Sequence, residues 1–255
     1  MIPALIALFS ILFFGGPGEI FYVDNLEKGV KKYVVEKEIK KEILGDIKYT
    51  KKLFKEFEKE RKKDFKQFMD LYTNKNTSTE LFDTFFENLQ YSRTDFQEKI
   101  VDQRLLIFAK LKQEEWDQIV ETSETVTEKR LAKIEKKEAK GKKELFAKTK
   151  AQIETTITSA EIKMKLLNGL EFVQDETMTL ENFLLSINST QNNILADKNS
   201  GKEQLLEIIA EDNEFRKSLI ESLVSFHKLA ADHCSNQEWD IIIKTFSKEM
   251  QMSSK

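Results

Sequence analysis

The residues best suited to catalysis or metal binding are two histidines and one cysteine, which lie close together in the sequence at His227, His233 and Cys234. His227 and Cys234 would share one face of a helix but lie two turns apart, about 10 Å. That distance is too long for one zinc ion, whose ligands lie about 2 Å from the metal. Neither histidine follows a glutamate at the three-residue spacing of di-iron helical bundles, because Val224 and Ala230 occupy those positions. We therefore predict no catalytic residue, no metal site and no cofactor.

Other signatures of chemistry are missing from the sequence. It contains no glycine-rich phosphate loop, no Cys-x-x-Cys pair and no Gly-x-Ser-x-Gly elbow. Lysine-rich stretches at residues 51–66 and 129–150 are interleaved with glutamates, which would repel the phosphates of a nucleic acid. We expect a protein that is not an enzyme and does not bind nucleic acid.

The composition predicts an all-α fold made of long antiparallel helices. The only prolines are Pro3 and Pro17, so residues 18–255 contain none, and few glycines follow that point. Proline and glycine supply most turns, so their scarcity indicates long helices with few connections. A charged fraction of 33% suits helices with a wide solvated surface.

Two long helices are predicted to begin the two halves of the body. The first should run from about residue 24 to 72, with apolar residues spaced by threes and fours, and would extend roughly 70 Å. A capping box from Thr77 to Glu80 should then start a second helix. In the second half, a helix over about residues 142–193 is expected to play the part of the first.

An internal repeat is the strongest pattern in the chain. Residues 77–120 align without gaps on residues 200–243, at a constant offset of 123. The alignment matches the caps, the apolar face and the only two tryptophans; its matched pairs include Thr77 and Ser200, Arg93 and Arg216, Phe96 and Leu219, and Trp116 and Trp239. Helical periodicity could align the apolar face but would not place both tryptophans, so the pattern favours duplication of one helical-hairpin unit.

Trp116 and Trp239 each lie at the fourth position of a short helix that follows a tight turn. A residue before the cap, Leu111 or Cys234, would pack on the tryptophan as a hydrophobic staple. The alternative is an exposed tryptophan that anchors a partner. We predict a structural or partner-anchoring role for both tryptophans and for the matched Arg93 and Arg216.

The N-terminal segment carries a membrane signal. Residues 2–14 contain no charge, and the apolar side chains expected to enter lipid include Ile2, Leu5, Leu8, Phe9, Leu12, Phe13 and Phe14. Thirteen residues is the length of a signal-peptide core. Continuing the count to Val23 gives a span with one charge, Glu19, and favours an uncleaved anchor over a cleaved signal. Lysines after the segment favour a cytoplasmic body by the positive-inside rule, whereas the short core favours export, and we expect an extracytoplasmic, periplasmic body.

These patterns give four predicted parts. Residues 1–23 form a membrane anchor or signal segment, residues 24–127 the first hairpin repeat, residues 128–143 an exposed linking helix or linker, and residues 144–255 the second repeat. In build alone the architecture resembles small exported bacterial helical-hairpin proteins such as the Spy-type periplasmic chaperones. The expected function is a membrane-tethered helical scaffold or accessory subunit that contacts lipid through residues 1–23 and binds a membrane or envelope protein complex. The alternative is an extracytoplasmic chaperone-like or sensing module.

Overall fold

A computed structural model describes residues 17–138, 145–186 and 189–251. In these residues the chain forms ten α-helices, one short 3₁₀ helix and no strand, which confirms the all-α prediction. The elements are η2 (Pro17–Phe21), α2 (Leu26–Tyr33), α3 (Lys37–Thr73), α4 (Thr79–Ala109), α5 (Gln113–Thr122), α6 (Val126–Glu138), α7 (Ala147–Thr156), α8 (Ala160–Leu185), α9 (Ser189–Ala196), α10 (Lys202–His233) and α11 (Asn236–Gln251).

The prediction of one helix from residue 24 to 72 is wrong, because the chain breaks between α2 and α3. Val34 leaves the helix with an extended backbone and is buried, and Glu36 is the extended N-cap of α3. The Glu115 carboxylate accepts a hydrogen bond from the backbone N–H of Val35 and so stabilises the break. The uninterrupted helix α3 has 37 residues and extends about 55 Å rather than 70 Å. The predicted helix over residues 142–193 is likewise divided, into α7, α8 and α9.

The helix bounds follow the offset of 123 well beyond the aligned segment. Five pairs of bounds lie 123 positions apart: the ends of α2 and α7 (Tyr33 and Thr156) and of α3 and α9 (Thr73 and Ala196), and the starts of α3 and α8 (Lys37 and Ala160), α4 and α10 (Thr79 and Lys202), and α5 and α11 (Gln113 and Asn236). One pair departs from the pattern, because α3 is continuous where its counterpart ends at Leu185 and resumes as α9.

The loops between the long helices also share their hydrogen bonds. Thr77 Oγ1 donates to Leu71 O at 2.7 Å. At the same offset, Ser200 Oγ donates to Ile194 O at 2.6 Å. Both hydroxyls therefore close the end of the preceding helix, and the predicted N-caps are wrong by one residue. The N-caps of α4 and α10 are Ser78 and Gly201.

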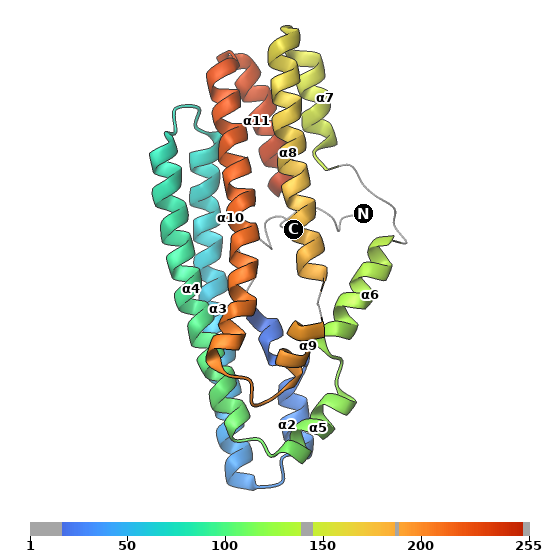
Figure 1. The fold of residues 1–255 in the computed structure, drawn as a ribbon. Helices are drawn as coiled ribbons and strands as arrows, with labels where there is room; N and C mark the ends of the chain where they lie inside the picture. Colours follow the sequence, from blue (N-terminus) through green and yellow to red (C-terminus); the bar gives the residue numbers. More distant parts are fainter. Residues whose placement is uncertain (1–16, 139–144, 187–188, 252–255) are drawn as a thin grey trace.

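The two repeats are interlocked by their tips. We define the first tip as residues 68–89 and the second tip as residues 191–212, which are the ends of the two long hairpins. The buried residues of the first tip belong to a core built otherwise from α7, α8, α10 and α11. The second tip contributes Leu195, Leu205 and Ile209 to a core built from α2, α3, α4 and α5. Figure 1 shows the result, with the loop between α3 and α4 beside α10 and α11, and with α9 beside α2 and α5 at the other end.

Part of the predicted membrane segment lies inside the protein. Ile20, Phe21, Tyr22 and Val23 are all buried in the core that contains α4 and α5, and Ile20 is only 2% exposed. The extension of the lipid-spanning segment to Val23 is therefore wrong, because side chains packed in this core cannot also contact lipid. The residues expected to enter lipid, from Ile2 to Phe14, lie outside the described residues. Within the described part of the chain, no helix is both long and apolar enough to cross a bilayer.

Candidate functional site

Each tip docks into the corner between a long helix and a short helix of the other repeat. These two corners, α4–α5 and α10–α11, are the places where the sequence puts its tryptophans and where the halves of the chain meet. We call them the first and second docking sites.

Arg104 is the centre of the first docking site. Its guanidinium is fully buried and donates to Leu195 O at 3.0 Å and Asp197 O at 2.9 Å, and it also donates to Ile20 O. Its guanidinium carbon lies 4.4 Å from the centre of the Phe108 ring. Burial lowers the pKa of Arg104 to about 10, so the side chain stays charged at neutral pH. One cation therefore joins three parts of the chain that are distant in sequence.

Trp116 closes the first docking site from the α5 side. Its indole N–H donates to Ala196 O at 2.8 Å, at the end of α9. The ring contacts Phe108 at a centroid distance of 4.6 Å and is only 2% exposed. Leu111 is buried in the same core, as expected for a staple.

His227 occupies in the second docking site the position that Arg104 occupies in the first, at the same offset. Its Nε2 lies 3.2 Å from Asn74 O. A carbonyl oxygen only accepts, so Nε2 carries the proton and Nδ1 is the unprotonated nitrogen. Burial lowers the pKa of His227, which favours this neutral form. Its ring meets the Tyr72, Phe82 and Trp239 rings edge-on, at centroid distances of 5.2, 4.8 and 5.0 Å.

Two further side chains, Tyr72 and Lys75, hold the first tip in place. Tyr72 Oη donates to Leu223 O at 3.0 Å. Lys75 Nζ donates to Cys234 O at 2.6 Å, just beyond the end of α10. Trp239 is buried in the same core as Cys234.

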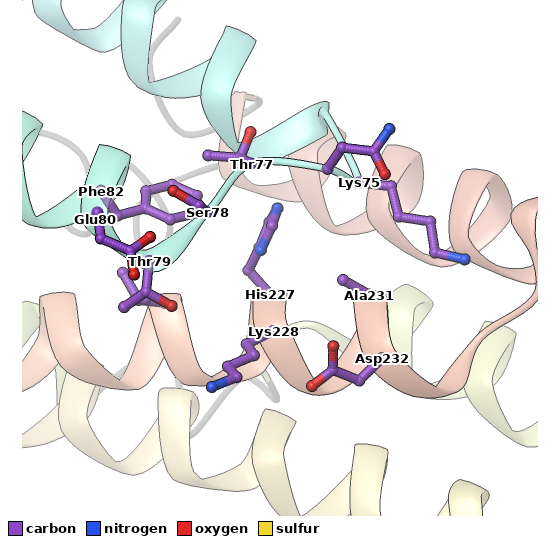
Figure 2. Close-up of a pocket in the computed structure, with 12 residues that line it drawn as sticks. Lys75, Thr77, Ser78, Thr79, Glu80, Phe82, His227, Lys228, Ala231 and Asp232 are labelled. Carbon is purple, nitrogen blue, oxygen red and sulfur yellow. The ribbon is translucent and has the colours of Figure 1, made fainter.

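The second docking site borders a cavity. A cavity of about 280 Å³ lies between the loop before α4 and the outer face of α10, with His227 in its wall (Figure 2). The shorter His227 and Ala231 stand where the first site has Arg104 and Phe108. The ion pair between Lys202 and Asp102 at 2.7 Å has no counterpart, because Thr79 and Ser225 occupy the equivalent positions. Two side chains in the wall of the cavity, His227 and Ala231, are therefore smaller than their counterparts in the first docking site.

Charged groups of both signs surround the cavity. Lys75, Lys228, Glu80 and Asp232 line it, together with the hydroxyl-bearing loop residues Thr77 to Thr79. Ser78 hydrogen-bonds to Glu80 and lowers the pKa of that carboxyl group. The lining has no net charge and no arrangement of a nucleophile with a base, so the cavity does not indicate a reaction.

The matched arginines predicted from the repeat lie where α4 packs against α10. Arg93 and Arg216 are both buried, and the positive charge of Arg216 adds to burial in lowering the pKa of Arg93. Arg216 pairs with Asp212 at 3.7 Å. Beside them, Gln97 and Asn213 exchange two hydrogen bonds, at 2.9 and 3.3 Å. Arg93 therefore lies close to its own counterpart, Arg216, and this contact marks the pseudo-two-fold axis that relates the repeats.

The burial of both tryptophans favours the structural interpretation over the partner anchor, since neither ring has surface left for a second protein. Cys234 is buried, and burial raises the pKa of its thiol to about 11. Among the described residues, no group of three or more histidine, cysteine or acidic side chains could hold a metal ion. Sequence reasoning missed Arg104, although the offset of 123 pairs it with His227 and would have drawn attention to it.

Comparison with protein-family models, with curated proteins and with solved structures finds no match.

Proposed function

We propose that the chain is a non-catalytic helical scaffold, tethered to a membrane by its N-terminal segment and bound to a membrane or envelope protein complex. The observation that carries the proposal is the way the chain enters the body. Residues 20–23 are buried between α4 and α5, and Arg104 holds the carbonyl of Ile20. The chain is therefore packed into the body from residue 20 onward, where a segment anchored in lipid would join it.

The body is suited to a scaffold in two further respects. The interlocked tips tie both ends of an elongated bundle together (Figure 1), so its outer faces keep a fixed spacing. The buried arginines and tryptophans are used within the chain, which leaves the exposed helix faces for a partner. The body is proposed to lie on the extracytoplasmic side.

Flotation with lipid vesicles tests the tether. The full chain should float with vesicles, and the double substitution Leu8→Asp/Leu12→Asp should abolish flotation while the circular dichroism of the body stays helical. Leu131→Asp is the matched control, since Leu131 is 54% exposed on α6 and should tolerate the same charge. Full chain that stays in the soluble fraction without detergent, with Met1 retained, would exclude the tether. Protease accessibility in intact cells reports the side of the membrane.

The partner is tested by cross-linking in membranes followed by purification. A scaffold should bring down a membrane protein at fixed stoichiometry, and only with the wild-type N-terminal segment. A set of unrelated proteins at variable yield would count against a dedicated complex.

A chaperone-like or sensing module is the second candidate, and one observation favours it. Tyr49 on α3 and Phe172 on α8 are matched at the offset of 123, and both are about half exposed, at 52% and 51%. Single exposed aromatics are common on protein surfaces, but a matched pair is less so. If the pair binds unfolded clients, Tyr49→Ser/Phe172→Ser should remove any suppression of aggregation by the purified protein.

A further inference from the structure

The segment that enters the body also fastens the second tip. We define the strap as residues 19–23. The strap is bound to the first repeat by a backbone hydrogen bond, in which Val126 N–H donates to Tyr22 O at 2.8 Å. The ring centres of Phe21 and Phe108 lie 6.3 Å apart, and so do those of Tyr22 and Trp116. Tyr22 has a φ of 64°, a left-handed conformation that a tyrosine adopts only when its surroundings impose it.

Two arginines join the strap to the second repeat. Arg104 donates to Ile20 O in the strap and to Leu195 O and Asp197 O in the second tip. Arg130 of α6 pairs with Glu19 in the strap and donates to Ser186 O, at the end of α8, at 2.5 Å. Each guanidinium therefore contacts the strap and the second repeat at once. The planar guanidinium has several N–H groups that point in different directions, whereas the compact ammonium of a lysine could not reach both partners in this way.

The two tips are not held alike. The first tip continues the uninterrupted helix α3 and is held by Tyr72, Lys75 and His227. The second tip begins after the end of α8, with the short helix α9, which has only eight residues. A short helix after a break has little stability of its own and depends on the contacts that hold it.

We propose that the strap is a releasable fastening: displacing residues 19–23 frees α9 and the following loop from the first repeat and uncovers the apolar faces of α4 and α5 around Trp116. The first tip stays docked, because none of its bonds passes through the strap. The coupling is a property of the body alone. Only the source of the displacement, a pull transmitted from a membrane-anchored segment, rests on the proposed function.

Release would change the surface of the protein. Leu195 would leave the core, and Phe108 and Trp116 would lose the cover that α9 and the following loop provide. Such a surface fits an apolar helix of a partner, which would replace the tip in the same corner. The strap would thus link the position of the N-terminal segment to the availability of a binding site.

Hydrogen–deuterium exchange on the full chain in detergent tests the fastening. Arg130→Gln should make the amides of residues 189–201 exchange roughly tenfold faster, because a charge-assisted bond on each side of the arginine is lost. The amides of residues 68–82 in the first tip should not change. Lys129→Gln is the matched control, since Lys129 is the next residue on α6 and pairs with Asp24 outside the strap.

A reciprocal pair separates the strap from general loosening. Arg104→Lys keeps the charge but loses the fork, and should speed exchange in the second tip only. His227→Gln should speed exchange in the first tip only. Equal changes at both tips in either variant, or no change in the second tip with Arg130→Gln and Arg104→Lys, would overturn the proposal. Flotation of the same variants is unaffected on this view, so failure of the tether and failure of the strap give different results.

Discussion

The matched tryptophans allow one contact to be measured against a control within the same chain. Trp116 and Trp239 lie at equivalent positions and are both buried, at 2% and 3% exposure. Trp116 Nε1 donates to Ala196 O at 2.8 Å, whereas Trp239 Nε1 forms no hydrogen bond with any residue that the structure describes. Replacing either tryptophan by phenylalanine removes the same side-chain volume, but only Trp116→Phe removes a hydrogen bond to another residue.

The expected energies follow from this difference. Loss of packing should cost about 1–2 kcal/mol in either variant. Trp116→Phe also leaves the partly buried Ala196 carbonyl without its donor, which adds about 1–3 kcal/mol. The free energy of unfolding should therefore fall further in Trp116→Phe than in Trp239→Phe, by about 1–3 kcal/mol.

Urea unfolding followed by circular dichroism measures both values, with similar slopes expected because the buried surface hardly changes. Each variant keeps one tryptophan. Fluorescence therefore reports the core around Trp116 in Trp239→Phe, and the core around Trp239 in Trp116→Phe. Because the tips are exchanged between the cores, fluorescence and circular dichroism should give one midpoint in each variant. Equal destabilisation of the two variants would refute the role of the Ala196 bond, and separate midpoints would refute the interlocked cores.

Three further predictions address packing, pH and reactivity. Gly29→Ala should destabilise the protein by about 1–3 kcal/mol, because a Cβ there would lie 2.8 Å from Ile119. Gly45→Ala, inside α3, places its Cβ where no atom lies within 4 Å, and should stabilise the protein by about 0.5–1 kcal/mol. Thermal unfolding of the two variants checks both signs. Burial holds the pKa of His227 below its ordinary value of 6.5, so the unfolded chain binds the proton more tightly than the folded chain does. The stability that neutral His227 contributes is therefore complete above pH 6.5. It is lost as the pH falls toward 5, by up to about 1.4 kcal/mol per pH unit. Urea titrations at pH 7.5 and 5 should show a smaller loss in His227→Gln than in the wild type, and an equal loss would contradict the assignment. The thiol of Cys234 should react with an alkylating reagent at pH 8 much more slowly in the folded protein than in urea, because its pKa is about 11 and it is buried; equal rates would show that the site opens freely.

Features set by local chemistry could be predicted from the sequence. The absence of proline after Pro17 and the spacing of apolar residues determine an all-α fold, because both act on the backbone within a few residues. Ser235 and Glu238 have the residue types and spacing of a capping box, and the Ser235 N–H donates to the glutamate at 2.7 Å. The offset of 123 predicted matched helices, and the burial of Trp116 and Trp239 could be expected from the staple.

Features that depend on distant contacts could not be predicted. Val34 looks like one more apolar helical residue in sequence. The break after it is stabilised by the backbone N–H of Val35, which donates to the carboxylate of Glu115, 80 positions away. Ile20 to Val23 continue an apolar run that predicts a lipid-spanning segment, but these side chains pack in a protein core with residues of α4 and α5. Arg104 is an ordinary charged residue in sequence, and only the arrival of Ile20, Leu195 and Asp197 at one point makes it the centre of a docking site. The tertiary structure decided which surfaces met, since burial energy depends on apolar area and not on the origin of the residues that supply it.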